Sequence, residues 1–281
     1  MRLRHAARSL SLFTALAAGG ACTPAGEFTL LTYNVHGLPG SVTGDDTEAR
    51  MRAISPHLND FDVAAIQENF FYGVALAESV VDHLAYHFTE MRPGAVTNGG
   101  LSVFSTIPAS YTGGDPWEAC NGYLDAANDC LASKGFELVR LAVPFTPIEM
   151  DLYDLHMDAG NSPADDAARA AQTEQLLAAI EAESAGRAVM VTGDFNMSID
   201  DPEDVPIRDH LLAAAGLTDA CAAVGCPEPD HIDQLFFRSG TSVALTVTSW
   251  SRDETFVDDQ GAPLSDHSPI VFGVAYGPAQ P

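Results

Sequence analysis

Four short polar clusters lie beside apolar stretches of the chain, and their residue types are those that bind cations and move protons. In sequence order they are Thr32-Tyr33-Asn34, Gln67-Glu68-Asn69, Gly193-Asp194-Phe195-Asn196 and Ser265-Asp266-His267. Strands that end together in an open α/β sheet bring such clusters to one rim. Carboxylate and amide oxygens are ligands of hard divalent cations, and a neighbouring histidine can act as a base. The inventory predicts metal-assisted hydrolysis of a phosphate ester.

Each of these side chains also has a plainer interpretation. Glu68 ends an apolar strand, where a carboxylate must pair, bind a metal or face water, so a salt bridge at the rim is the alternative to a metal ligand. Asp194 can orient or deprotonate a water, and Asn196 can hold a phosphate oxygen, although an ordinary Asp/Asn turn has the same sequence. Asp233 can hold an imidazole in one tautomer. His156 ends another strand, where a lone histidine is more often structural.

The hydrophobic pattern predicts the interleaved strands and helices that must position these clusters. Strands are predicted at residues 28–35, 61–66, 101–104, 107–111, 136–143, 149–155, 188–191, 231–238, 242–250 and 269–276. Helices are predicted at residues 47–58, 73–84, 164–184 and 206–215. Residues 115–133 have no clear period and predict a long loop. Because no repeat or linker divides the chain, we predict one α/β domain with two sheets inside and helices outside.

The chain has the composition of a globular but strongly acidic protein. Its 281 residues include 39 Asp and Glu against 13 Lys and Arg, which gives a formal net charge of −26. Non-specific DNA binding depends on Lys and Arg that neutralise phosphates, so this balance disfavours a stable complex with nucleic acid. The alternative is that the acidity only keeps the protein soluble.

Residues 1–21 have the pattern of an export signal. Three arginines precede an apolar stretch at residues 10–18, and small residues lead to Cys22. A buried N-terminal helix is the alternative. Cys22 resembles the lipid-modified cysteine of bacterial lipoproteins, although Gly19 stands where such signals usually carry Leu, and plain cleavage near Ala21 is the other outcome. We expect a secreted or envelope-anchored protein whose catalytic domain spans residues 22–281.

The other four cysteines lie in two short polar stretches. Cys120 and Cys130 share one stretch, and Cys221 and Cys226 share the other. In an exported protein these pairs predict two short-loop disulfides. Metal binding is the weaker alternative, because no Cys-x-x-Cys pair occurs.

The order of the polar clusters resembles the endonuclease/exonuclease/phosphatase superfamily, which has the fold of pancreatic-type deoxyribonuclease. Gly193-Asp194-Phe195-Asn196 and the Ser-Asp-His-Ser-Pro run that begins at Ser265 are its most specific pieces, and the resemblance covers about residues 28–273. It implies a single-domain, four-layer α/β/β/α sandwich of two mixed sheets flanked by helices. It also implies a divalent cation, Mg²⁺ or another such as Mn²⁺ or Co²⁺, bound by Glu68, Asn34 and Asp266.

The same resemblance implies the roles of the catalytic residues. Asp194 and Asn196 are implied to position the attacking water and the phosphate. His267, oriented by Asp233, is implied as a general base or a transition-state stabiliser. His156 is implied as a donor to the phosphoryl oxygens.

Two further motifs resemble those of bacterial neutral sphingomyelinases and related phospholipase C enzymes. These are Asn98-Gly99-Gly100 and the partly matching run Ala132-Ser133-Lys134-Gly135-Phe136. Asn98 and Lys134 are therefore expected to bind substrate. Lys134 is the only lysine in the chain, and a solvated loop lysine is its plainer interpretation. Trp117 and Tyr123, in the long loop, are the candidates for contact with a membrane.

These observations predict a monomeric, metal-dependent phosphodiesterase that acts on a phospholipid headgroup at a membrane surface. Sphingomyelin, cleaved to ceramide and phosphocholine, is the favoured substrate, because a neutral zwitterion approaches an acidic surface more readily than DNA does. A secreted nuclease of the same fold is the main alternative. A binding protein on a retired hydrolase scaffold is less favoured, because every expected polar position is filled.

Overall fold

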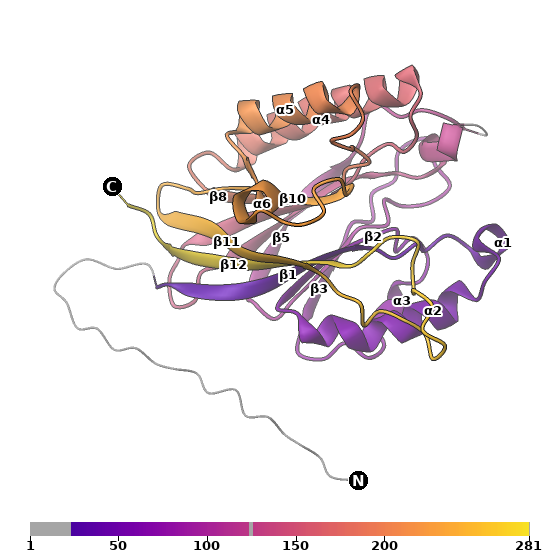
Figure 1. Ribbon diagram of the computed structural model, residues 1–281, viewed down its shortest axis with the longest axis horizontal. Coiled ribbons are helices and arrows are strands. Elements are labelled where there is room, and N and C mark those ends of the chain that lie inside the picture. The colour runs from indigo at the N-terminus through magenta and orange to yellow at the C-terminus, as the bar shows by residue number, and fades with distance from the viewer. Residues whose placement is uncertain (1–23, 124–125, 281) are drawn as a thin grey trace, which may run out of the picture.

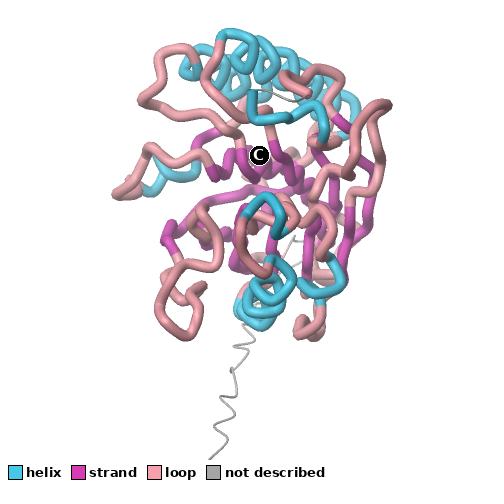
Figure 2. Tube along the Cα trace, turned by 90° about the vertical axis from the view of Figure 1, so that its right-hand side faces the viewer, coloured by secondary structure: helices cyan, strands magenta, loops and turns pink. Residues whose placement is uncertain are grey.

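Two six-stranded sheets stack face to face between outer layers of helices (Figure 1). The computed structural model describes residues 24–123 and 126–280, so the predicted export signal and Cys22 lie outside the described residues. In the view turned by 90°, helices lie above and below, with strands between them (Figure 2). This arrangement confirms the predicted four-layer sandwich of two mixed sheets in one domain.

The first sheet has the strand order β11-β12-β1-β2-β4-β3. Its strands are β1 (Gly26–Asn34), β2 (Val63–Gln67), β3 (Leu84–His87), β4 (Ser102–Ser105), β11 (Val243–Arg252) and β12 (Ile270–Pro278). β1 and β2 run parallel, and the other neighbours are antiparallel. The outer face of this sheet packs on α2 (Thr47–Ile54), the 3₁₀ helix Ser55–Asp60 and α3 (Gly73–Ala77).

The second sheet has the strand order β5-β6-β7-β8-β10-β9. Its strands are β5 (Ala109–Pro116), β6 (Gly135–Ala142), β7 (Glu149–His156), β8 (Ala188–Asp194), β9 (Thr218–Asp219) and β10 (Asp233–Arg238). Here β7 and β8 are the parallel pair. The outer face packs on α4 (Pro163–Glu183) and α5 (Asp204–Ala215), which lie along the top of Figure 1.

Alternating side chains divide each central strand between two cores. One set packs against the helices, and the other set meets the opposite sheet in an apolar layer that includes Leu30, Val63, Val139, Leu152 and Met190. Toward the carboxyl ends of β1, β2, β7 and β8, the inward-facing positions change from apolar to polar. The interior of the sandwich therefore becomes polar at one end only, and the site lies there.

The helix predicted at residues 73–84 is wrong beyond its first turn and a half. α3 ends at Ala77, and the edge strand β3 begins at Leu84. Ser79 N–H donates to Ser55 Oγ, and Val81 N–H donates to Asn59 Oδ1, so side chains replace the carbonyls that a longer helix would use. Of the apolar residues that suggested a helical face, Leu76 is buried within α3, whereas Val81 and Leu84 are exposed.

The remaining differences from the predicted elements are small. The helix expected at 47–58 becomes a 3₁₀ helix from Ser55, and the long loop at 115–133 contains a 3₁₀ helix, Ala126–Leu131. Two short helices were not predicted: α1 (Gly40–Thr43) and α6 (Ala220–Val224). Both predicted disulfides, Cys120–Cys130 and Cys221–Cys226, are formed.

Candidate active site

Four site residues lie at or just past the carboxyl ends of the two parallel strand pairs. Asn34 is the last residue of β1, and Glu68 directly follows β2. His156 and Asp194 end β7 and β8, where they are partners in the strand register. Both sheets end at the same edge of the sandwich, so residues far apart in sequence meet across the gap between the sheets.

Two more residues arrive from antiparallel strands. Asp233 begins β10 and lies opposite Asp194 in the register. His267 lies just before β12, and its loop is tied to the end of β1: Ser265 Oγ donates to Asn34 O at 2.7 Å and accepts from His267 N–H at 3.2 Å. A loop of the first sheet therefore contributes His267, and the second sheet contributes His156.

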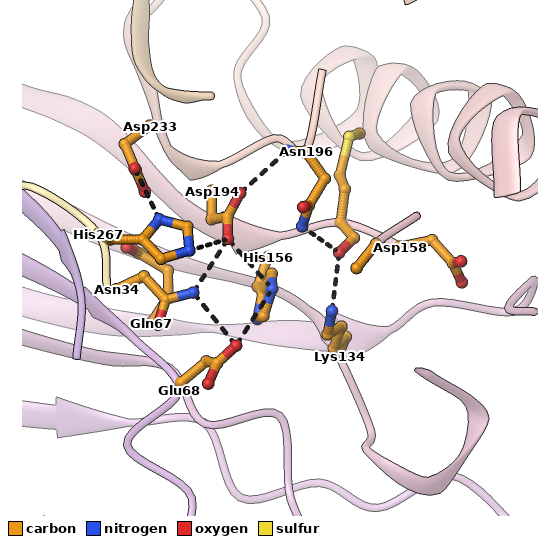
Figure 3. Close-up of polar contacts among 12 residues, drawn as sticks. Asn34, Gln67, Glu68, Lys134, His156, Asp158, Asp194, Asn196, Asp233 and His267 are labelled. Atoms are coloured by element: carbon orange, nitrogen blue, oxygen red, sulfur yellow. Dashed lines mark hydrogen bonds and ion pairs between the residues drawn. The ribbon is translucent and has the colours of Figure 1, made fainter. Parts of the chain in front are cut away.

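Asp194 is the centre of the hydrogen-bond network (Figure 3). Its Oδ2 accepts from Asn34 Nδ2 at 3.0 Å and lies 3.3 Å from His156 Nε2 and 3.8 Å from His267 Nε2. Its Oδ1 accepts from the backbone N–H of Asn196 at 3.0 Å. Burial and the charge of Asp233 raise the pKa of Asp194 to about 6. At neutral pH this carboxylate is ionised and is a far better proton acceptor than an ordinary aspartate.

His267 is held by a buried carboxylate. Its Nδ1 lies 2.8 Å from Asp233 Oδ2, which leaves Nε2 facing Asp194. Burial alone would lower the pKa of His267, but the hydrogen bond to Asp233 and the charges of Asp233 and Asp194 outweigh it and raise that pKa to about 10. The ring is therefore positively charged at neutral pH, and both of its nitrogens donate.

His156 has the opposite electrostatic character. It is only 1% exposed, and burial, followed by the charges of Lys134 and His267, lowers its pKa well below the usual range. The ring is neutral, with Nε2 close to Asp194 and 3.9 Å from Glu68 Oε1. The Trp117 indole donates to the backbone oxygen of His156 at 2.7 Å. Trp117 is buried, so the expectation that it contacts a membrane is wrong.

Glu68 is placed by an unusual backbone conformation. Its φ is +63°, and Asn69 N–H donates to Gly100 O at 2.7 Å. Gly100 has a φ of +70°, and a Cβ there would lie 2.8 Å from the Phe70 ring and 3.0 Å from the Cα of Glu68, so the position favours glycine. Asn98 Oδ1 accepts from Gly100 N–H at 3.0 Å and so shapes the turn beneath Glu68. The structure places Asn98 in this supporting turn, with no hydrogen bond to the network around Asp194 among the described residues.

The donor set around Glu68 fits a hard divalent cation. Glu68 Oε1 accepts from Asn34 Nδ2 at 3.2 Å, whereas the buried Oε2 has no hydrogen-bond partner among the described residues. Burial raises the pKa of Glu68, so a cation would relieve an unfavourable charge. Asn34 turns its amide nitrogen toward the two carboxylates, and its Oδ1 accepts from His36 N–H at 2.9 Å. Its oxygen would bind a cation only after the amide turned over and gave up that hydrogen bond. Asp266 lies at the exposed edge, 3.0 Å from His36 Nδ1.

Lys134 and Asn196 meet at one backbone carbonyl. Lys134 Nζ donates to Met157 O at 3.2 Å, and Asn196 Nδ2 donates to the same oxygen at 3.1 Å (Figure 3). Lys134 is 8% exposed and forms an ion pair with Asp129, so it is not a solvated loop lysine. Its charge opposes the effect of burial on the pKa of Glu68. The lysine therefore contributes positive potential to the site.

Sequence reasoning missed several residues that hold the site in place. Trp117 and Asp129 act through the long loop, and Gln67 was noted only as part of its cluster. The one usable signal was the alternation along the strand, because an inward-facing glutamine must find a partner inside the sandwich. Contacts made by the loop depend on tertiary structure and leave no periodic pattern.

Residues 31–267 match the model of the Endonuclease/Exonuclease/phosphatase family, which confirms the superfamily that the motifs resembled. Sphingomyelinases from Mycobacterium bovis and Mycobacterium tuberculosis are 30% identical to this chain over 277 residues, covering 90% of the chain. The chain spans about half the length of these curated relatives, 54% in each case.

Solved structures of two bacterial proteins have the same fold. Sphingomyelinase C from Streptomyces griseocarneus is similar with a TM-score of 0.65 and 19% identity, over 88% of this chain and 99% of that one. A double mutant of beta toxin from Staphylococcus aureus, with bound magnesium ions, has a TM-score of 0.64 and 15% identity over the same shares. At these identities the likeness concerns the fold.

Proposed function

The chain belongs to the endonuclease/exonuclease/phosphatase family, and on that premise we propose that it is a metal-dependent phosphodiesterase that removes a phospholipid headgroup. The observation that carries phosphodiester hydrolysis is the ionised Asp194 between a charged His267 and a neutral His156, beside the cation-compatible Glu68. Similarity to curated sphingomyelinases along nearly the whole chain supports sphingomyelin, cleaved to ceramide and phosphocholine.

In the proposed reaction, Asp194 orients the attacking water and accepts its proton. The bond from the water oxygen to phosphorus forms as the bond from phosphorus to the ceramide oxygen breaks, and the ceramide oxygen takes up a proton from solvent. His267 has Nδ1 fixed by Asp233 and donates from Nε2 to the phosphate as negative charge develops. The sequence left His267 open as base or stabiliser, and its raised pKa supports the stabilising role, because a protonated ring cannot accept a proton. His156 is proposed to donate from Nε2 to a phosphoryl oxygen. Asn196 is held by Asp194 and Met157 beside the same position.

A divalent cation such as Mg²⁺, held by Glu68 and Asn34 with Asp266 at the exposed edge, would neutralise charge on the phosphate and on the leaving oxygen. Lys134 adds a fixed positive charge that acts on both Glu68 and Asp194. With the cation, these groups favour a substrate that carries one phosphate, and the chain's net charge of −26 disfavours a polyanion.

A membrane surface is the proposed place of action. Two apolar side chains just after Glu68 are exposed, Phe71 at 56% and Val74 at 90%, and both can enter a lipid interface. In the described part of the chain, none of the helices combines the length and the apolar character needed to cross a bilayer. We propose that a monomer, secreted or anchored to the cell envelope, meets the membrane through this rim.

The test is a comparison of substrates with the purified chain. Sphingomyelin vesicles and supercoiled plasmid DNA are each incubated with Mg²⁺, with chelator, and with chelator followed by excess Mg²⁺, Mn²⁺ or Co²⁺. Release of phosphocholine that chelator stops and metal restores is the expected result. Fast nicking of plasmid without phosphocholine release would instead identify the nuclease alternative. Vesicle binding without any product would favour the binding protein.

A further inference from the structure

A layer of fully buried polar side chains fills the space between the sheets directly beneath the site. It comprises the inward-facing residues next to the site on four strands and one residue on β6, namely Thr32, Gln67, Asp154, Thr192 and Glu137. The next inward positions along these strands belong to the apolar core, so this layer is the boundary between core and site.

One short hydrogen bond in this layer joins the two sheets. Gln67 Nε2, on β2, donates to Asp154 Oδ1, on β7, at 2.6 Å and lies 3.3 Å from Thr32 Oγ1. Gln67 directly precedes Glu68, and Asp154 stands two residues before His156. The bond therefore lies under the boundary where the metal-compatible half of the site meets the histidine-bearing half.

Asp154 also faces a second buried carboxyl group. Glu137 is its partner in the β6–β7 register, and both Glu137 oxygens and Asp154 Oδ2 have no hydrogen-bond partner among the described residues. Among the described residues, no Lys, Arg or His forms an ion pair with either group. The charge of Glu137 contributes to the raised pKa of Tyr111 on β5, and the neutral His156 stands two residues after Asp154 on β7. Two carboxylates cannot both stay charged in such surroundings.

We propose that Glu137 and Asp154 share a proton and, with Gln67, form a brace that sets the separation of the two sheets beneath the site. A protonated carboxyl donates to its ionised neighbour, which leaves Asp154 Oδ1 free to accept from Gln67. All three are positioning residues, because none lies in the network around Asp194. The inference rests on the proposed function, since it concerns how Glu68 is held relative to His156.

The pKa values agree with this arrangement. Burial, followed by the charge of Asp154, raises the pKa of Glu137 well above its ordinary range, and burial raises that of Asp154. Folded-state pKa values above the unfolded ones mean that the folded protein holds extra protons. The pair therefore costs stability progressively as pH rises from the ordinary carboxyl range toward the raised pKa values.

Four variants distinguish a role in positioning the site residues from a role in folding stability alone. Gln67→Leu and Asp154→Leu remove the cross-sheet bond, and kcat is expected to fall by about 10- to 100-fold, because small misplacements of reacting groups have effects of that size. Asp154→Asn keeps an oxygen for Gln67 and gains an amide for Glu137, so it is expected to retain activity within about threefold. Asp151→Asn, on the outer face of the same strand, is the matched control for a buried carboxyl.

The decisive comparison is kcat against Tm, with Mg²⁺ affinity measured by calorimetry as a second readout. The brace predicts weaker Mg²⁺ binding and lower kcat for Gln67→Leu, and neither change for Asp151→Asn at a similar loss of Tm. Equal loss of kcat in Asp154→Leu and Asp151→Asn, or a fully active Asp154→Leu, would overturn it.

The dependence of folding stability on pH tests the shared proton. This test does not require the wild-type chain to cleave lipid. Glu137→Gln replaces the proton-bearing oxygen by an amide, so its loss of stability as pH rises above the ordinary carboxyl range is expected to be clearly shallower than that of the wild type. Parallel curves would refute the shared proton. Failure of the wild type on sphingomyelin, with this flattening intact, would refute the proposed function alone.

Discussion

Buried polar groups at the two ends of strand β7 differ in whether they have hydrogen-bond partners. Near its start, Asp151 Oδ2 accepts from Ser184 Oγ at 2.6 Å, and Oδ1 accepts from Arg140 Nε at 3.2 Å. Ser184 Oγ also lies 2.7 Å from the Tyr153 hydroxyl. Every buried oxygen of Asp151 has a partner here, and the result is a closed structural network between the sheet and α4.

At the carboxyl end of the same strand, several buried polar atoms have no hydrogen-bond partner within residues 24–123 and 126–280. They belong to residues of both sheets and the adjoining loop, and they are Glu68 Oε2, His156 Nδ1, Asp158 Oδ1 and Asp233 Oδ1. Groups left in this state raise the energy of the free protein and favour any ligand that satisfies them. The comparison teaches that this end of the sandwich is built for binding and the other for stability.

Among the tests of this contrast, Glu68→Gln is expected to have the largest effect. The amide keeps the shape of the side chain and removes the charge that a cation needs, so kcat/KM is expected to fall by about 10³-fold or more. Tm is expected to stay level or to rise, because a buried carboxylate is costly. Enzyme assays with a Mg²⁺ titration and a thermal melt give both quantities. Unchanged activity would remove the metal assignment.

Asp233→Asn should have the next largest effect. Without the carboxylate, His267 loses both its fixed orientation and the charge that holds its proton, so kcat is expected to fall by about 10²-fold with little change in KM. Steady-state kinetics on sphingomyelin vesicles measure this split. A change confined to KM would mean that Asp233 serves binding rather than the orientation of His267.

Asp151→Asn tests the start of β7, where the hydrogen bonds of Asp151 contribute to stability. It removes the charge that pairs with Arg140 and weakens the bond from Ser184, and the expected loss is about 1–3 kcal/mol of unfolding free energy. Chemical denaturation measures the loss, and kcat below the melting range is expected to match the wild type. A tenfold loss of kcat here would break the contrast between the two ends.

The smallest expected effect is on the pH dependence of folding stability. Burial and the charge of Asp129 raise the pKa of Asp158 to about 7, against opposition from Asn121 and Lys134. The folded protein therefore holds a proton there that the unfolded chain releases, and stability falls as pH rises from about 4 through 7. Relative to the wild type, Asp158→Asn is expected to gain a few degrees in Tm at pH 8 and almost nothing at pH 4. Equal differences at both pH values would contradict the raised pKa.

Much of the site could be predicted because the ends of strands can be recognised in the sequence. Asn34, Glu68 and Asp194 each follow an apolar run, and a polar residue at that place is a local signal. The helix wrongly extended from α3 to Leu84 shows the limit of the same reasoning. Apolar residues such as Val81 have a helical spacing there but face solvent, so no packing supports the helix.

The sequence by itself determined the α/β class, the family, both disulfide pairs and the residue types available for chemistry, because periodicity and short motifs are local properties. Tertiary structure alone decided that Asp194 lies between two histidines of opposite charge state, that Lys134 is buried beside Asp129, and that Gln67 reaches across to the other sheet. Charge state and contact depend on burial and on neighbours from distant strands, and no single stretch of the chain contains that information.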